Sequence, residues 1–212
     1  MSAHDADLAH LADGGVLAYP TETVWGLAAD SRNAAAVARL IAFKGDRGDA
    51  PISVLVSGRD ELAALGARPG PAASRLLEAF WPGPLTMVLP TDGGFAPGIA
   101  RADGAVGFRC SPHPVAANLA HGARAAGIGP LTATSCNRSG EPPARTRAQA
   151  AAVCGDGEGC DAPRLTAALV PDASGEPPSS VVDASGTTPK LLREGALSAA
   201  RLAEVASPGA FL

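Results

Sequence analysis

The sequence predicts an α/β protein built on a mixed β-sheet. Short apolar runs that end in proline or glycine alternate with segments whose apolar residues recur at helical spacing. Three apolar runs near the C-terminus follow one another as closely as hairpin strands do, which favours a mixed sheet over an all-parallel one. The chain has 212 residues, of which 46% are apolar and 18% charged. We therefore expect a single domain over residues 1–212.

The strands are short because glycine (25) and proline (19) are abundant in the chain. In chain order we expect strands at 14–20, 51–57, 84–90, 104–110, 130–135, 165–172, 180–185 and 189–194. Helices are expected at 34–44, 59–65, 73–80, 114–127, 146–153 and 198–206.

Two of these helices have clear start signals. Asn33 is a suitable N-cap for the first, whose Val37, Leu40 and Ile41 fall on one face. Pro114 opens another, where its missing N–H is not needed. In contrast, Trp81, Pro82 and Gly83 are expected to form a tight turn that leads into a strand.

Composition and charge exclude several classes of protein. The net charge is −4, whereas a protein that holds a nucleic-acid duplex by its phosphates needs a basic surface. No run of about 18 apolar residues exists to span a membrane. The N-terminal residues lack a basic region followed by an apolar one, so we expect a cytoplasmic protein rather than a secreted one. Only Lys44 and Lys190 are lysines; the arginine bias suits phosphate and carboxylate recognition, although a GC-rich genome also explains it.

The cysteines and histidines do not predict a metal site. Cys110, Cys136, Cys154 and Cys160 form no C-x-x-C pair, so neither a zinc site nor a disulfide framework is supported. Cys136 is expected to be a small packed residue rather than a reactive thiol.

Three loops concentrate polar residues next to predicted strands or helices. PTETVWGL (20–27) offers hydroxyls and a carboxylate at a strand end, where open α/β folds bind ligands. The alternative interpretation of this segment is an ordinary helix cap. FKGDRGDAP (43–51) carries two cations but resembles no Walker loop and reads most simply as a solvated turn. TATSCNRSG (132–140) provides hydroxyls and backbone N–H groups that suit a phosphate. These loops predict a protein that binds a small molecule or nucleotide.

Taken together, the motifs resemble the YrdC/TsaC family of threonylcarbamoyl-AMP synthases. The resemblance covers about residues 13–197 and rests on motifs that occur in the family's order. They are GGVLAYPTETVWGL, FKG with APISVLV, WPGPLT, GFRCSPHP, LTATSCNRSGEP, PSSVVD and LLREGAL.

The resemblance implies a fold and a reaction. The fold would be a twisted mixed sheet with flanking helices around a large, positively lined central cavity. The reaction would join L-threonine, bicarbonate and ATP, with Mg²⁺, into threonylcarbamoyl-AMP and release pyrophosphate. Partner transferases would then pass the threonylcarbamoyl group to adenosine 37 of tRNA, so that tRNA is an indirect partner, with no DNA or membrane involved.

The resemblance also implies roles for individual residues. Lys44, Arg47, Ser135 and Asn137 would be catalytic and would bind ATP together with Arg109 and Arg193. Substrate would be bound by Thr21, Thr23, Ala133 and Ser180. Asp183 would be structural.

The chain departs from the family at the first of these motifs. The family has K-x-R followed by proline, whereas this chain reads K-G-D-R, with Asp46 at the arginine position. A carboxylate there would oppose ATP phosphates. Two alternatives therefore stay open: a divergent relative that handles another carbamoyl-adenylate, and a non-catalytic RNA-binding module, against which the net charge counts.

Overall fold

A computed structural model describes residues 2–46, 48, 50–155, 163–167 and 176–206. Its strands form two mixed sheets. The smaller has the order β7-β2-β1-β8 and the larger the order β10-β9-β4-β5-β3-β6. The strands are β1 (Leu17–Tyr19), β2 (Gly26–Ala28), β3 (Val54–Leu55), β4 (Leu85–Pro90), β5 (Ala105–Arg109), β6 (Leu131–Thr132), β7 (Thr134–Ser135), β8 (Arg164–Leu165), β9 (Ser180–Asp183) and β10 (Lys190–Arg193).

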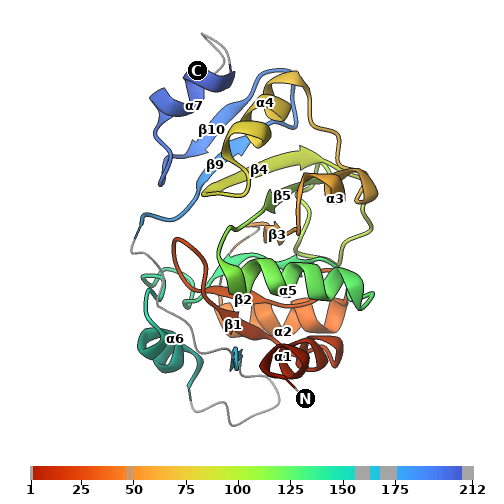
Figure 1. Ribbon diagram of the computed structural model, residues 1–212, viewed down its shortest axis with the longest axis vertical. Coiled ribbons are helices and arrows are strands. Elements are labelled where there is room, and N and C mark those ends of the chain that lie inside the picture. The colour runs from red at the N-terminus through yellow and green to blue at the C-terminus, as the bar shows by residue number, and fades with distance from the viewer. Residues whose placement is uncertain (1, 47, 49, 156–162, 168–175, 207–212) are drawn as a thin grey trace.

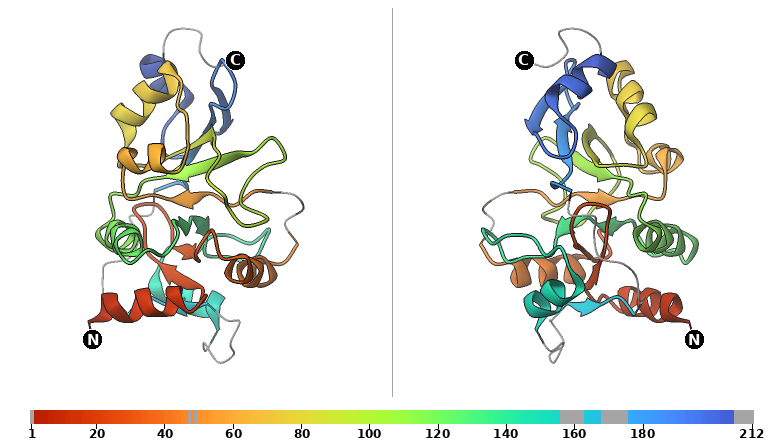
Figure 2. Two further views of the ribbon diagram at one scale, coloured as in Figure 1. Left: turned by 90° about the vertical axis from the view of Figure 1, so that its right-hand side faces the viewer. Right: turned by 60° about the vertical axis from the view of Figure 1, so that its left-hand side comes forward.

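Helices lie at both ends of the molecule and beside its middle (Figure 1). They are α1 (Ala3–Ala12), α2 (Ala34–Lys44), α3 (Arg59–Ala64), α4 (Pro71–Phe80), α5 (Pro114–Ala125), α6 (Arg147–Cys154) and α7 (Ala199–Ala206). Helices α4 and α7 pack against each other beside the larger sheet, while α1 packs on α5 and β1 near the smaller one. Figure 2 shows the same separation of the two sheets from two further directions. Among the described residues, no helix has the length and apolar character needed to cross a bilayer.

The mixed α/β class is confirmed, but the expected single sheet is divided in two. The division falls inside the predicted strand 130–135, because Leu131–Thr132 pairs with β3 in the larger sheet and Thr134–Ser135 pairs with β2 in the smaller one. The side chain of Thr132 connects the two sheets by hydrogen bonds. Its Oγ1 donates to the Leu27 carbonyl (2.9 Å) and accepts from the Ala29 N–H (2.9 Å). The one predicted strand is thus two short strands, β6 in the larger sheet and β7 in the smaller one.

Most predicted elements are present with shifted ends. Helix α2 has the predicted bounds, and Asn33 caps it by accepting from the Ala35 and Ala36 N–H groups. The predicted strand 165–172 is seen as β8 up to Leu165, and its part from 168 onward lies outside the described residues. The turn at 81–83 feeds β4 as expected. Gly83 is needed there because a Cβ would stand 2.3 Å from the Phe80 carbonyl oxygen.

Two elements were not predicted. Helix α1 has only Asp7 and Leu11 buried, so its apolar pattern is faint. Its Asp7 carboxylate is held instead by the Thr166 hydroxyl (2.5 Å) and the Ala167 N–H (3.0 Å). Strand β2 follows a polar loop and spans three residues, too short to show alternation.

Candidate functional site

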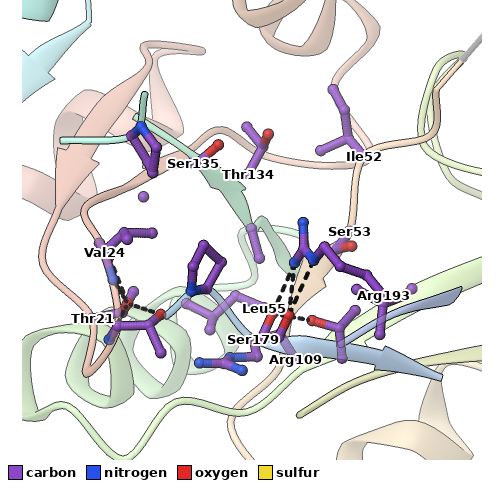
Figure 3. Close-up of a pocket in the computed structure, with 18 of the residues that line it drawn as sticks. Thr21, Val24, Ile52, Ser53, Leu55, Arg109, Thr134, Ser135, Ser179 and Arg193 are labelled. Atoms are coloured by element: carbon purple, nitrogen blue, oxygen red, sulfur yellow. Dashed lines mark hydrogen bonds between the residues drawn. The ribbon is translucent and has the colours of Figure 1, made fainter. Parts of the chain in front are cut away.

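A cavity of about 530 Å³ is lined by residues of both sheets (Figure 3). This volume lies within the range of small-molecule sites, roughly 300–1,000 Å³. Six residues predicted to form the site line it: Thr21, Thr23, Arg109, Ala133, Ser135 and Arg193. The lining also includes residues that the sequence did not single out, among them Tyr19, Ser53, Thr86, Arg101 and Ser179.

The loop between β1 and β2 is held closed by Thr21. Its Oγ1 donates to the Val24 carbonyl (2.6 Å) and accepts from the Thr23 and Val24 N–H groups (3.2 and 3.3 Å). The Thr23 hydroxyl lies 3.2 Å from the same oxygen. Thr21 therefore acts mainly as a brace for the loop, and Thr23 has the freer hydroxyl at the cavity wall.

Lys44 lies behind the cavity wall and does not line it. Its Nζ, at the end of α2, donates to the carbonyl oxygens of Ser135 (2.7 Å) and Asn137 (3.1 Å) and to Asn137 Oδ1 (2.9 Å). The Ser135 hydroxyl donates to the same Oδ1 (2.6 Å), and Asn137 Nδ2 donates to the Glu141 carbonyl (2.6 Å). The structure thus brings Lys44, Ser135 and Asn137 together in one network, of which only Ser135 reaches the cavity.

Cys136 packs behind this network. It is fully buried, and its Sγ lies 3.9 Å from Cys154 Sγ. Burial of this kind agrees with the expected packing role.

Arg109 is the most buried cation of the cavity lining, with 6% of its surface exposed. Its Nη2 donates to the Glu22 carboxylate, which also accepts from the Ser111 hydroxyl. Burial lowers the pKa of Arg109, and the adjacent Glu22 carboxylate opposes that shift. Its Nη1 is buried without a hydrogen-bond partner within the described part of the chain. A buried donor without an acceptor is costly.

Arg193 approaches the cavity from β10 and reaches over Ser179, as Figure 3 shows. Its Nε and Nη2 donate to the Ser179 carbonyl (3.2 and 2.8 Å). The Ser179 hydroxyl lies 2.9 Å from Thr86 Oγ1. Ser179 is a lining residue that sequence reasoning missed, although it directly precedes the residue chosen from the same motif.

Ser180 does not line the cavity. It is fully buried, its hydroxyl donates to the Leu197 carbonyl (2.6 Å), and its oxygen accepts from the Gly195 and Leu197 N–H groups (2.9 and 3.0 Å). Because β-strand side chains alternate in direction, Ser179 and Ser180 point to opposite faces. Ser180 thus anchors the turn after Arg193.

The structure adds information on two further motif residues, Asp183 and Asp46. Arg101 lines the cavity and pairs with Asp183 (2.5 Å), which gives Asp183 a positioning partner that the sequence did not indicate. Asp46 is exposed and accepts from the Gly48 N–H (3.0 Å), and it is not part of the cavity lining. Arg47 lies outside the described residues.

The donor set allows Mg²⁺ only together with a ligand that brings its own oxygens. No Asp or Glu belongs to the described lining of the cavity, and no group of three or more His, Cys, Asp or Glu residues in the described ranges could hold an ion. Mg²⁺ is usually held by one or two carboxylates plus substrate phosphates. Here the Ser135 hydroxyl, the member of the Lys44 network that reaches the cavity, could join such phosphates.

Comparisons with known proteins identify relatives of this chain. A putative threonylcarbamoyl-AMP synthase of Mycobacterium tuberculosis is 35% identical over 192 residues, covering 91% of this chain and 83% of the relative. A threonylcarbamoyl-AMP synthase of Xanthomonas campestris is 43% identical over 150 residues, covering 68% and 76%.

Solved structures give the same fold. The structure of P. abyssi Sua5 complexed with L-threonine has a TM-score of 0.84 at 28% identity and covers 96% of this chain, which spans 56% of that longer chain. E. coli YciO has a TM-score of 0.77 at 19% identity, covering 94% and 92%, and supports the fold alone. The model of the Sua5, YciO and YrdC family, described as "Telomere recombination", matches residues 9–195. The chain therefore belongs to the Sua5/YciO/YrdC family.

Proposed function

We propose that this chain is a threonylcarbamoyl-AMP synthase, which joins L-threonine, bicarbonate and ATP and releases pyrophosphate. One observation carries the proposal: a single cavity collects the hydroxyls of Thr23 and Ser135 and the guanidinium groups of Arg109 and Arg193. The chain shares 35–43% identity with proteins named as such synthases, and the Sua5 structure of similar fold holds L-threonine.

The reaction requires positioning and charge stabilisation rather than a covalent enzyme intermediate. The threonine amine attacks carbon dioxide and loses a proton, or attacks bicarbonate with loss of water, to give a carbamate. A carbamate oxygen then attacks the α-phosphorus of ATP. The bond from that phosphorus to the bridging oxygen breaks, and pyrophosphate leaves with the electron pair. Cationic donors that are fixed before the reaction stabilise the charge that develops on the phosphoryl oxygens.

The cavity residues divide between the two substrates. We assign the nucleotide to Arg109, Ser135 and Arg193, with Lys44 and Asn137 holding the Ser135 loop and Arg47 contributing from the neighbouring motif. The amino acid is assigned to Thr23, Ala133 and Ser179. Thr21 and Ser180 support these contacts through the backbone bonds described above. Mg²⁺, when bound, would neutralise part of the phosphate charge.

The wider setting follows from the same proposal. The product would be passed to tRNA by partner transferases, so this chain would contact tRNA indirectly, and the protein would work in the cytoplasm as one domain. An acidic chain with net charge −4 is suited to small substrates and not to tight binding of nucleic acid by itself.

Pyrophosphate release from ATP and bicarbonate, measured with and without L-threonine, tests the proposal. Threonine-dependent release is expected. ATP binding without release would favour a relative that handles another carbamoyl-adenylate. Salt-dependent RNA binding without ATP turnover would instead favour the RNA-binding module.

A further inference from the structure

Glu22 connects the two walls of the cavity. It lies between Thr21 and Thr23 in the loop after β1 of the smaller sheet. Its carboxylate, however, accepts hydrogen bonds from residues at the end of β5 in the larger sheet and just after it. One oxygen accepts from Arg109, the last residue of β5, and the other accepts from the Ser111 hydroxyl. The side chains of Arg109 and Glu22 are 7% and 19% exposed, so solvent screens the pair little.

The pair leaves one half of the guanidinium unused. Nη2 of Arg109 is directed at Glu22, whereas Nη1 is buried and has no hydrogen-bond partner in the described ranges. A guanidinium is planar and rigid, so fixing one nitrogen fixes the direction of the other. Because Arg109 lines the cavity, the orientation of its guanidinium decides which of its N–H groups a ligand oxygen can meet. Figure 3 shows the Arg109 side chain extending toward the loop that carries Thr21.

The carboxylate itself is held from both sides. The Thr21 hydroxyl closes the loop on its own backbone through bonds to Val24 and Thr23, which fixes the direction in which Glu22 leaves the chain. On the far side, Ser111 Oγ accepts from the His113 N–H (3.2 Å), directly before α5. Glu22 therefore bridges the loop between β1 and β2 and the strand that carries Arg109.

We propose that Glu22 is a positioning residue, which holds the Arg109 guanidinium in its orientation at the cavity wall, where it meets an anionic group of the bound substrate. The inference rests on the proposed function and deepens it. Glu22 touches no substrate in this account and acts through Arg109. Since the same loop carries Thr23, the position of Thr23 and the orientation of Arg109 are linked through one side chain.

Two variants of Glu22 test the inference by steady-state kinetics of threonine-dependent pyrophosphate release. Glu22→Gln keeps the shape of the side chain and removes its charge, and Glu22→Ala removes the bridge. Misplacement of a catalytic group by about 1 Å can cost about 100-fold in rate, and we expect kcat/KM to fall by about that factor in Glu22→Ala and less in Glu22→Gln. Added formate or acetate should restore part of the Glu22→Ala rate, because a small carboxylate can occupy the space left beside Arg109.

A matched control removes the charge of a different acidic residue. Asp60 pairs with Arg124 (2.7 Å), with 70% and 44% of their side chains exposed, and Asp60→Asn should leave kcat and KM unchanged. Wild-type kinetics in both Glu22 variants would overturn the inference. The inference would also be overturned if kcat/KM fell only in proportion to a fall in melting temperature and was not restored by formate or acetate.

Failure of the proposed function can be distinguished from failure of the inference. If the wild-type protein releases no pyrophosphate under any condition, the proposed function fails. The Glu22→Gln crystal structure then decides the inference alone. A guanidinium that rotates away supports it, and one that keeps its orientation overturns it.

Discussion

Lys44 and Arg109 are two buried cations at the cavity, and they differ in how completely they are hydrogen-bonded. The three hydrogens of the Lys44 ammonium match three acceptors in the loop that carries Ser135 and Asn137. Arg109, by contrast, has one nitrogen bonded to Glu22 and another without a partner among the described residues. Lys44 lies behind the wall, whereas Arg109 lines it.

This difference indicates two kinds of contribution. The Lys44 cluster is closed, so its first effect is to fix the shape of the Ser135 loop, and a ligand must replace existing bonds to reach the ammonium. Arg109 has a nitrogen without a partner in the described part of the chain, so an oxyanion that meets this nitrogen replaces no existing bond. Substitution of Lys44 should therefore lower both stability and activity, whereas substitution of Arg109 should lower mainly activity.

Replacement of Lys44 should have the largest effect. Lys44→Met leaves the carbonyl oxygens of Ser135 and Asn137 buried and without their charged donor, which should cost about 3 kcal/mol in the free energy of unfolding. Turnover should be lost as well. Urea denaturation and pyrophosphate release measure the two effects.

Lys190 supplies the control, because it is the other lysine of the chain and is exposed. Lys190→Met should leave both quantities unchanged. If Lys44→Met kept its full stability, the closed network would not hold the loop.

Replacement of Arg109 should separate activity from stability more cleanly. Arg109→Lys keeps a positive charge near Glu22 but loses the rigid fork, so turnover should fall by about 100-fold with a smaller change in melting temperature than for Lys44→Met. Equal stability losses at the two positions would remove the distinction between a closed and an open cation.

The two neighbouring serines sharpen the same comparison on a smaller scale. Ser180→Ala removes a fully buried hydroxyl with three hydrogen bonds and should lower stability by about 2 kcal/mol. Ser179→Ala should instead raise KM for one substrate and leave the melting temperature near the wild-type value. The opposite pattern would show that Ser180 contacts the substrate.

The smallest effect is expected at Asp46. Its side chain is exposed and accepts from the Gly48 N–H, and screened surface charges contribute little. Asp46→Asn should therefore change ATP affinity, measured by calorimetry, by less than about twofold. A tenfold gain would mean that this carboxylate opposes the phosphates after all.

Local chemistry explains how much the sequence could predict. Helix α2 was predicted with correct ends because Asn33 and the spacing of Val37, Leu40 and Ile41 are signals within a few residues. The motif loops were located for the same reason, and several of their residues line one cavity.

Long-range pairing explains what the sequence could not predict. Glu22 and Arg109 are 87 residues apart in the sequence, and no residue pattern around the PTET motif indicates that they pair. The choice of Ser180 over Ser179 depended on which face of β9 points to the cavity, and that follows from pairing with β4. The split of one predicted strand between two sheets likewise arises from its partners β3 and β2.

The most direct measurement is mass spectrometry of the product formed from ATP, L-threonine and isotopically labelled bicarbonate. The account predicts that the wild-type protein yields threonylcarbamoyl-AMP carrying the label, that Arg109→Lys yields about 100-fold less, and that Lys190→Met yields as much as wild type. Wild-type protein that binds ATP and L-threonine but forms no labelled adenylate would contradict it.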